Sequence, residues 1–199
     1  MTTSFLQLPI LQQALLMTFV EQLLKWNKAY NLTAITEQAA VLTKHIDDSL
    51  AINPYLHGDR ILDVGTGAGF PGIPLAISNP DKQFILLDSN GKKIRFIKQM
   101  IQVLSLPNVI AQQVRVEEWQ DEDGFSTIVT RAFAAICDML SGTQHLLAKD
   151  GIFLAMKGHV TDEELAKIPA EFLVSAIYPI QVPQLDAERN IVLISRDIK

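Results

Sequence analysis

A glycine-rich turn carries the clearest chemistry in the sequence. Gly65, Gly67 and Gly69 follow the short apolar segment 61–64 in a G-x-G-x-G spacing and precede a helical segment. Glycines in this position permit positive φ and let a ligand lie against bare backbone. The spacing differs from the G-x-G-x-x-G of dinucleotide-binding proteins, and no Gly-Lys-Ser/Thr of a P-loop follows it. The turn therefore predicts a small-ligand site, with a simple tight turn as the alternative.

Two aspartates lie on either side of this turn. Asp88 closes the next apolar segment, where the carboxyl edge of a parallel sheet would let it accept hydrogen bonds from both ribose hydroxyls of a nucleoside. Asp63 lies near the end of the first segment, and we expect it close to the ligand. A carboxylate there repels a pyrophosphate but attracts a sulfonium and an amino group. The pair favours S-adenosylmethionine over a nicotinamide cofactor, while the alternative for Asp88 is a helix cap.

The other reactive side chains form no constellation that would support a different chemistry. The histidines are scattered and lack metal-ligand spacing such as HExxH. The single Cys137 cannot form an intramolecular disulfide. We therefore expect no metal site.

Length and composition indicate one soluble globular unit. The chain has 199 residues, of which 48% are hydrophobic and 20% charged, so it can bury a sizeable core. No apolar run reaches the roughly 18 residues that span a bilayer, and the N-terminus does not resemble a signal peptide, so we expect a cytoplasmic protein. The formal net charge of -5 argues mildly against a general polyanion binder but allows one localised basic face.

The elements that must position the turn alternate between apolar and helical segments. The helical segments are 72–79, 92–104 and 132–147. Strands that alternate with helices indicate βαβ units and a parallel sheet. The last two apolar segments have no helix between them, so we expect an antiparallel hairpin at the sheet edge, with Pro179 and Pro183 limiting its first strand. The expected strands are 60–64, 83–88, 108–116, 125–131, 151–157, 171–180 and 189–196.

The N-terminal part of the chain has a different pattern. Apolar residues recur every three or four positions from Leu11 to Trp26, which predicts a helix over 9–28. Residues 26–36 are typical of a turn, and a second helix is expected over 37–50. We therefore expect a small helical cap, residues 1–55, packed on a Rossmann-like α/β domain, residues 56–199. Its sheet should be mostly parallel, seven-stranded and flanked by helices.

Several longer motifs make the sequence recognisable. VGTGAGFPGIPLAI, LLDSNGKKIRFI, TRAFA and MKG resemble the signature set of the GidB/RsmG family, as do WNKAYNLT and HIDDSL nearer the N-terminus. The resemblance runs from about Trp26 to Gly158. Thr66 replaces the serine that many relatives have, and Phe70 stands where other apolar residues also occur. Neither departure changes the charge or the backbone requirements of the turn.

This resemblance implies a class I methyltransferase that transfers a methyl group from S-adenosylmethionine to N7 of a guanine in 16S rRNA. Its partner would be the small ribosomal subunit, and a monomer is favoured. Guanine N7 has a lone pair and no proton to remove, so the reaction needs alignment rather than a general base. The cofactor contacts that the family implies are Gly65, Phe70, Val116, Glu117 and Arg131, and those that the chemistry of the turn implies are Gly67 and Asp88.

Arg131, in TRAFA, ends a strand at the edge where α/β proteins bind their ligands. It is a candidate for a catalytic role as a clamp on the cofactor or on an RNA phosphate. The alternative is an ion pair with Glu117 or Glu118. His45, within HIDDSL, is more typical of a structural hydrogen bond than of catalysis.

RNA contacts are expected from basic and aromatic side chains. The basic cluster that begins at Lys92 and continues to Lys98 is either a phosphate-contacting patch or a solvated helix face. Aromatic side chains stack on unpaired bases, but Trp26 continues the apolar stripe and is expected in the core. The expected RNA contacts are Tyr30, Asn31, Lys92, Lys93 and Lys157.

Three other functions stay open on the sequence. The first is a methyltransferase of the same fold that acts on another RNA, a small molecule or a protein. The second is a nicotinamide-dependent oxidoreductase, which Asp63 and the glycine spacing disfavour. The third is a non-catalytic ribosome-binding module that has kept the fold.

Overall fold

A seven-stranded sheet runs through the centre of the computed structural model, which describes residues 2–131, 133 and 135–197. The strand order is β3-β2-β1-β4-β5-β7-β6. The first five strands of this order pair in parallel, and β7 is antiparallel to both of its neighbours. The expected mostly parallel sheet is confirmed. The strands are β1 Arg60–Val64, β2 Gln83–Asp88, β3 Val109–Gln113, β4 Phe125–Thr130, β5 Leu147–Lys157, β6 Phe172–Pro179 and β7 Asn190–Arg196.

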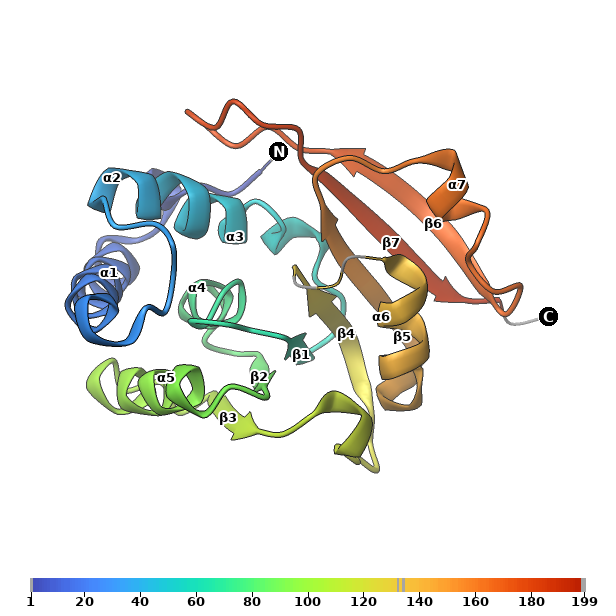
Figure 1. Cartoon of the computed structure of the whole chain (residues 1–199), viewed down its shortest axis with the longest axis horizontal. Coiled ribbons are helices and arrows are strands. Elements are labelled where there is room, and N and C mark those ends of the chain that lie inside the picture. Colours follow the sequence, from blue (N-terminus) through green and yellow to red (C-terminus); the bar gives the residue numbers. More distant parts are fainter. Residues whose placement is uncertain (1, 132, 134, 198–199) are drawn as a thin grey trace.

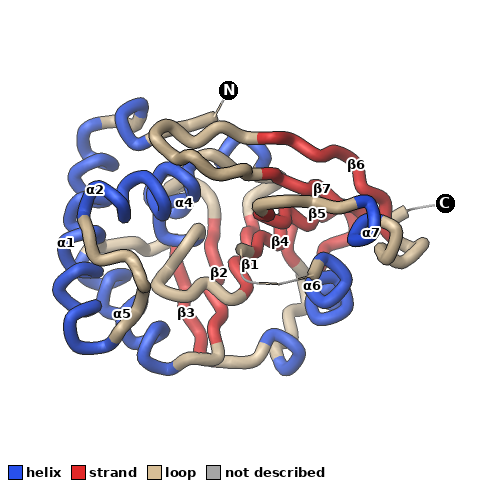
Figure 2. The backbone as a smooth tube through the Cα atoms, turned by 45° about the horizontal axis from the view of Figure 1, so that its top comes forward, coloured by secondary structure: helices blue, strands red, loops and turns tan. Residues whose placement is uncertain are grey.

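Helices cover both faces of this sheet (Figure 1). The core on one face joins side chains of α1, α4 and α5 to the strands, and the core on the other face joins those of α6. The tube view shows the same two groups on opposite sides of the strands (Figure 2). The α-helices are α1 Ile10–Tyr30, α2 Gln38–Val41, α3 Asp48–Leu50, α4 Gly72–Ser78, α5 Gly91–Val103, α6 Ile136–Thr143 and α7 Asp162–Leu165.

The central strands carry apolar side chains toward both faces of the sheet, because helices cover both faces. Ile61 of β1 and Phe84 of β2 belong to the core beneath α1, α4 and α5. Leu62 and Ile85, the next residue on each strand, belong to the core beneath α6. Successive side chains of a strand point to opposite faces, so a strand buried on both sides has no polar alternation.

The C-terminal hairpin forms as expected and closes one side of the sheet. β6 and β7 pair antiparallel, from Phe172 opposite Arg196 to Pro179 opposite Asn190. β7 also pairs with β5, so it lies inside the sheet and β6 forms the edge. Pro179 therefore ends an edge strand, where its missing N–H costs no ladder hydrogen bond.

Several element boundaries differ from the sequence-based expectation. α1 continues to Tyr30 because WNKAY holds no helix breaker, and it ends at Asn31, whose φ is 52°. The helix expected over 132–147 runs only from Ile136 to Thr143 and is followed by a 3-10 turn, because β5 already begins at Leu147. Its expected start at Ala132 lies outside the described residues. β3 ends at Gln113, and the end of the segment expected as strand 108–116 enters a 3-10 turn, Val116–Glu118.

The N-terminal helices share the core of the sheet. Leu16, Phe19 and Leu23 of α1 are fully buried, and Phe19 contacts Phe70 and Phe96 at ring-centroid distances of 5.4 and 5.8 Å. The helix expected over 37–50 is one helical stretch, α2 to α3, with a π-helical segment Leu42–Asp47 in its middle. Burial of each such large apolar side chain stabilises the fold by roughly 1.5–3 kcal/mol. Val41, Ile46 and Leu50 of the second helical stretch belong to the same core.

Candidate functional site

The glycine turn lies at the carboxyl edge of β1 and is held there by the end of β2. The N–H groups of Gly65 and Thr66 both donate to the Leu87 carbonyl oxygen, at 2.9 and 3.0 Å. Gly67 N donates to Asp88 Oδ2 at 2.8 Å. The φ angles of Gly65 and Gly67 are 69° and 62°, in the left-handed region that favours glycine. The turn is therefore folded onto β2, with Asp88 beside it.

Gly67 and Gly69 have different roles in this turn. A Cβ on Gly67 would meet only Lys93 Nζ at 3.9 Å and the Gly65 carbonyl oxygen at 4.0 Å, so the space next to Gly67 is open to a ligand. A Cβ on Gly69 would lie 2.8 Å from Ile73 Cγ1, so this glycine is required for packing. Gly67 therefore gives a ligand access to the backbone, whereas Gly69 serves the packing of the turn.

A cavity of about 300 Å³ opens on the β2 side of the turn. Gly65, Asp88, Val116 and Glu117 all line it. Asp88 Oδ2 accepts from Gly67 N, and Oδ1 accepts from Asn90 N at 2.8 Å. Each carboxylate oxygen keeps a further lone pair, so Asp88 can also accept hydrogen bonds from a ligand. Four residues expected at a cofactor site thus surround one cavity.

A second cavity, of about 200 Å³, lies between the turn and the N-terminal helical stretch. The other expected cofactor contacts, Gly67, Phe70 and Arg131, line this second cavity. Gly65 and Lys93 line both cavities, so the two cavities adjoin across the turn. Together they offer an elongated site that runs from the ends of β2 and β3 to the end of β4.

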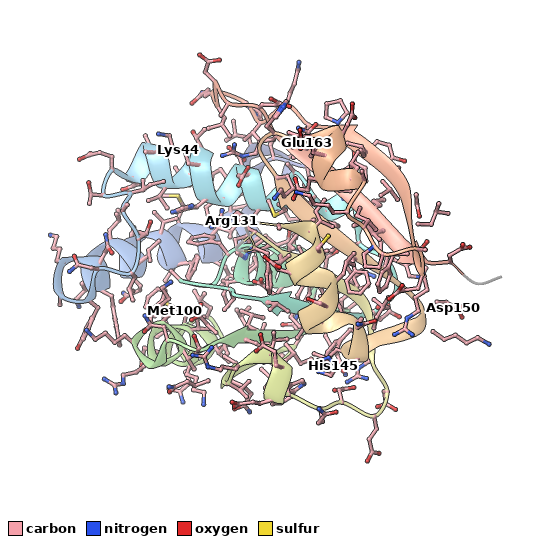
Figure 3. All side chains as sticks on the ribbon, turned by 45° about the vertical axis from the view of Figure 1, so that its right-hand side comes forward. Lys44, Met100, Arg131, His145, Asp150 and Glu163 are labelled. Carbon is pink, nitrogen blue, oxygen red and sulfur yellow. The ribbon has the colours of Figure 1, made fainter. Side chains whose placement is uncertain are left out.

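Arg131 follows the end of β4, where Figure 3 labels it. Two contacts hold its side chain. Its Nη1 lies 3.3 Å from Asp48 Oδ2, and its guanidinium carbon lies 5.5 Å from the centre of the Phe70 ring. The ion pair with Glu117 or Glu118 that the sequence offered as an alternative is therefore wrong, because the N-terminal helical stretch supplies the carboxylate instead. Arg131 also lines the second cavity, so its side chain can meet a ligand there.

Asp63 supports the turn from beneath rather than lining either cavity. The side chain is buried, and its Oδ2 accepts from Thr66 Oγ1 at 2.6 Å and from Gly72 N at 2.8 Å. Oδ1 has no hydrogen-bond partner within the described part of the chain. Burial raises the pKa of Asp63 to about 6, against the two hydrogen bonds, which lower it. Asp63 thus fixes the shape of the turn and leaves one buried carboxylate oxygen unpaired.

His45 forms part of the wall of the second cavity as a neutral imidazole. Its Nδ1 lies 3.1 Å from the Lys44 carbonyl oxygen and its Nε2 lies 2.9 Å from Thr33 Oγ1. A proton on Nδ1, with Thr33 donating to Nε2, satisfies both contacts. The ring stacks on Phe70 at a centroid distance of 4.5 Å. Burial and the charge of Arg131 lower the pKa of His45 to about 4, so the ring stays neutral at physiological pH.

The residues expected to contact RNA fall into three environments. Lys93 lines both cavities, and Lys92 is exposed beside it at the start of α5. Tyr30 is 40% exposed and lies against Trp26 at a ring-centroid distance of 5.2 Å. Lys157, by contrast, is mostly buried and pairs with Glu164 at 2.9 Å.

Trp26 and Asn31, two neighbours of Tyr30, lie on opposite sides of the boundary between core and surface. Trp26 contacts Phe96 of α5 at 5.6 Å, in line with the core role expected for it. Asn31, which follows Tyr30, is exposed where α1 ends. Tyr30 and Asn31 therefore form an exposed corner at the end of α1.

Several residues of the site were not singled out from the sequence, and two of them hold side chains that were. Thr33 orients His45, and Asp48 binds Arg131. Both lie inside motifs that resemble the family, WNKAYNLT and HIDDSL. The resemblance of these two motifs to the family could have identified Thr33 and Asp48. Only the folded structure shows that both residues lie beside the glycine turn.

The described residues contain no group of three or more His, Cys, Asp or Glu side chains that could hold a metal ion. None of the helices in this part of the chain has the length and apolarity that crossing a bilayer demands.

Comparison with known sequences gives a match over nearly the whole chain. The family model described as rRNA small subunit methyltransferase G, GidB, matches residues 12–192. The ribosomal RNA small subunit methyltransferase G of Aeromonas salmonicida is 53% identical over 180 residues, which cover 90% of this chain and 86% of the relative. That of Shewanella amazonensis is 52% identical over 186 residues, which cover 94% and 90% of the two chains.

Comparison with solved structures concerns the fold. A SAM dependent methyltransferase from Aquifex aeolicus is similar with a TM-score of 0.60 over 78% of this chain and 92% of the other. The two sequences are 15% identical over this match, so the likeness shows the fold alone. The chain has the Rossmann-like fold of these methyltransferases, and the expected fold class is confirmed.

Proposed function

Because the chain belongs to the GidB family of rRNA small subunit methyltransferases, we propose that it transfers a methyl group from S-adenosylmethionine to N7 of a guanine in 16S rRNA. The observation that carries this proposal is the pair of adjoining cavities on the glycine turn. Asp88 lines one of them and Arg131 the other. A nucleoside with a charged amino-acid tail needs this combination of groups.

The side chains around the turn fit such a cofactor. Asp88 would accept the ribose hydroxyls, since both of its oxygens keep acceptor capacity. The open space at Gly67 allows close approach to the backbone. The unpaired Oδ1 of Asp63 adds negative potential beneath the turn, which favours a cationic ligand. The residues proposed to hold the cofactor are Gly65, Gly67, Phe70, Asp88, Val116, Glu117 and Arg131.

The chemistry that S-adenosylmethionine supplies is a methyl group already activated by a positively charged sulfur. The role left to the protein is alignment and exclusion of water. N7 of guanine attacks with a lone pair and loses no proton, so no general base is required. His45 matches this expectation, because both of its ring nitrogens are engaged by Thr33 and Lys44. Arg131 is proposed as the residue that clamps a charged group of cofactor or RNA.

The proposed partner is the small ribosomal subunit, and a ribosomal substrate would place the reaction in the cytoplasm. Lys92 and Lys93 are the best-situated phosphate contacts, because they flank the cavities at the start of α5. Tyr30 and Asn31 are proposed as a stacking corner for unpaired bases. Lys157 is also proposed as an RNA contact, and to bind RNA it would have to break its ion pair with Glu164. We propose a monomeric enzyme without a metal.

The test combines methyl-labelled S-adenosylmethionine with small ribosomal subunits from cells that lack this enzyme. After incubation, nuclease digestion of the 16S rRNA locates the label. Label recovered as 7-methylguanosine is the expected result. Cofactor binding without labelled 16S rRNA would overturn the proposed acceptor and point to another RNA, a small molecule or a non-catalytic role. Binding of NAD with no binding of S-adenosylmethionine would overturn the proposed cofactor.

A further inference from the structure

A buried carboxylate joins three distant parts of the chain behind the second cavity. Asp48, in α3, has a side chain that is only 2% exposed. Its Oδ2 lies 3.3 Å from Arg131 Nη1 and its Oδ1 lies 2.8 Å from Arg189 Nε. Arg131 follows β4, and Arg189 directly precedes β7. One carboxylate thus receives an arginine on each oxygen.

The two arginines differ in what else they do. Arg131 lines the second cavity and lies over the Phe70 ring. Arg189 Nη1 donates to the Glu188 carbonyl oxygen, and the Arg189 carbonyl accepts from Ile180 N where the β6–β7 pairing ends. Arg189 therefore anchors Asp48 to the C-terminal hairpin, whereas Arg131 connects it to the cavity.

A contribution to the stability of the fold is a weak explanation for a buried carboxylate paired with two arginines. Desolvation of buried charges offsets most of their attraction, so apolar residues of similar volume often stabilise a fold as well. An arginine side chain that is not held samples many rotamers, however, and a functional guanidinium must stay in one place. A fixed carboxylate behind Arg131 supplies this restraint.

We propose that Asp48 is a positioning residue, which holds the Arg131 guanidinium over Phe70 and in the wall of the second cavity. This inference rests on the proposed function, in which Arg131 contacts the cofactor. Arg189 engages the other oxygen of Asp48 and ties the carboxylate to the C-terminal hairpin, so the oxygen that meets Arg131 is not shared with it. Asp48 itself does not line either cavity and acts only through Arg131.

The test measures the binding of S-adenosylmethionine and S-adenosylhomocysteine by titration calorimetry. Asp48→Asn keeps the shape of the side chain and removes its charge, and we expect its dissociation constant to rise about tenfold. Asp47→Asn, on the neighbouring residue, is the matched control, because Asp47 accepts a hydrogen bond from Phe5 N, and among the described residues it forms no hydrogen bond or ion pair with Arg131. We expect wild-type binding from it. Should Asp48→Asn fail to fold, Asp48→Glu replaces it and should show a smaller loss.

Two further variants separate positioning from general support of the fold. Arg189→Gln breaks the same buried cluster but spares Arg131, and we expect cofactor affinity within about twofold of wild type. In an Arg131→Gln background, Asp48→Asn should cause no additional loss, because its effect passes through Arg131. Equal defects in Arg189→Gln and Asp48→Asn, or a full loss in the Arg131→Gln background, would overturn the proposal.

A measurement without cofactor tests the positioning role of Asp48 separately from the proposed binding of S-adenosylmethionine. Nitrogen-15 spectra of the arginine side chains report how rigidly the Arg131 guanidinium is held. We expect its signal to broaden or shift in Asp48→Asn and to stay unchanged in Asp47→Asn. An Arg131 guanidinium that stays equally ordered in Asp48→Asn would overturn the positioning role, even if the wild-type protein bound no S-adenosylmethionine.

Discussion

Burial favours the uncharged forms of two titratable side chains near the glycine turn, Asp63 and His45. Asp63 keeps its proton up to about pH 6 in the folded protein, and His45 stays neutral down to about pH 4. Both groups therefore change protonation on unfolding within the same weakly acidic range. Their contributions to the change of stability with pH have opposite signs and partly cancel in the wild-type protein. Variants of each residue are therefore needed to measure them.

Replacement of Asp63 by asparagine should change how stability depends on pH. Between pH 3.8 and about 6 the folded protein binds a proton that the unfolded chain has lost, so the contribution of Asp63 to stability falls as pH rises. In Asp63→Asn this loss of stability with rising pH is absent, because asparagine does not titrate. The unfolding free energy of the variant, relative to wild type, should rise by about 2 kcal/mol from pH 4 to pH 7. Urea unfolding at several pH values measures it, and a pH-independent difference would contradict the raised pKa.

Replacement of His45 by glutamine should show the opposite trend. The unfolded chain protonates this residue below pH 6.5, whereas the folded protein resists protonation down to about pH 4. The contribution of His45 to stability is thus lost as pH falls through this range. His45→Gln should gain about 3 kcal/mol relative to wild type from pH 7 to pH 4. The same urea series tests it, and the Asp63→Asn data provide the control of opposite sign.

Asp88 is the residue on which cofactor affinity should depend most directly. Asp88→Ala removes the proposed acceptor of the ribose hydroxyls and should weaken S-adenosylhomocysteine binding by about 1–3 kcal/mol. Asp59→Ala, an exposed aspartate at the opposite end of β1, is the control and should bind as wild type does. Calorimetric titration distinguishes the two. Unchanged affinity in Asp88→Ala would show that the ribose site lies elsewhere.

At the scale of elements, α1 supports the glycine turn through its apolar face. Phe19 is fully buried between Phe70, in the turn segment, and Phe96 of α5. Residues 1–55 are therefore proposed as an extension whose packing completes the domain formed by 56–199. This division assigns the walls of the second cavity to both parts, since Thr33 and His45 come from the extension.

Removal of the Phe19 ring should weaken the fold and the site together. Phe19→Ala should cost about 3–5 kcal/mol of unfolding free energy, because it leaves a cavity against Phe70. Leu11→Ala, at an exposed position of the same helix, should change stability by less than about 0.5 kcal/mol. Chemical denaturation of both variants checks this. Similar stabilities would mean that α1 contributes little to the core.

Much of this arrangement could be predicted from the sequence because local patterns determine it. The apolar runs of β1 and β2 and the glycines between them indicated a strand, a turn and a helix. Asp88 was found because strand ends of a parallel sheet share one edge. The pairing of Asp48 with Arg131 had no such signal, because residues this far apart meet only when the whole chain has folded. The position of β7 between β5 and β6 likewise depends on the completed sheet.

At the scale of the whole molecule, a net charge of -5 has to be reconciled with an RNA substrate. α5 carries basic residues and no acidic ones, and it begins at the cavities with Lys92 and Lys93. A local basic element of this kind can meet phosphates although the protein as a whole is acidic. Binding should therefore depend on the shape of the substrate as well as on its charge.

The position of guanine N7, the proposed target atom, leads to a prediction about the shape of the RNA substrate. N7 of guanine faces the deep, narrow major groove of A-form RNA, which side chains reach poorly. The guanine should therefore be unpaired or displaced from its stack when it is methylated. We expect methyl transfer to structured ribosomal substrate to be faster than transfer to a duplex of the same sequence. Equal initial rates on the two would contradict it.

The place of β7 in the sheet also has a consequence for the synthesis of the protein. β5 pairs with β4 on one side, but its other edge stays open until residues 190–196 have been translated. A nascent chain that stops before Arg189 would leave this edge exposed and would lack one of the two arginines at Asp48. Exposed strand edges promote aggregation. Incomplete translation products should therefore be removed by cellular quality control rather than persist as partly active enzyme.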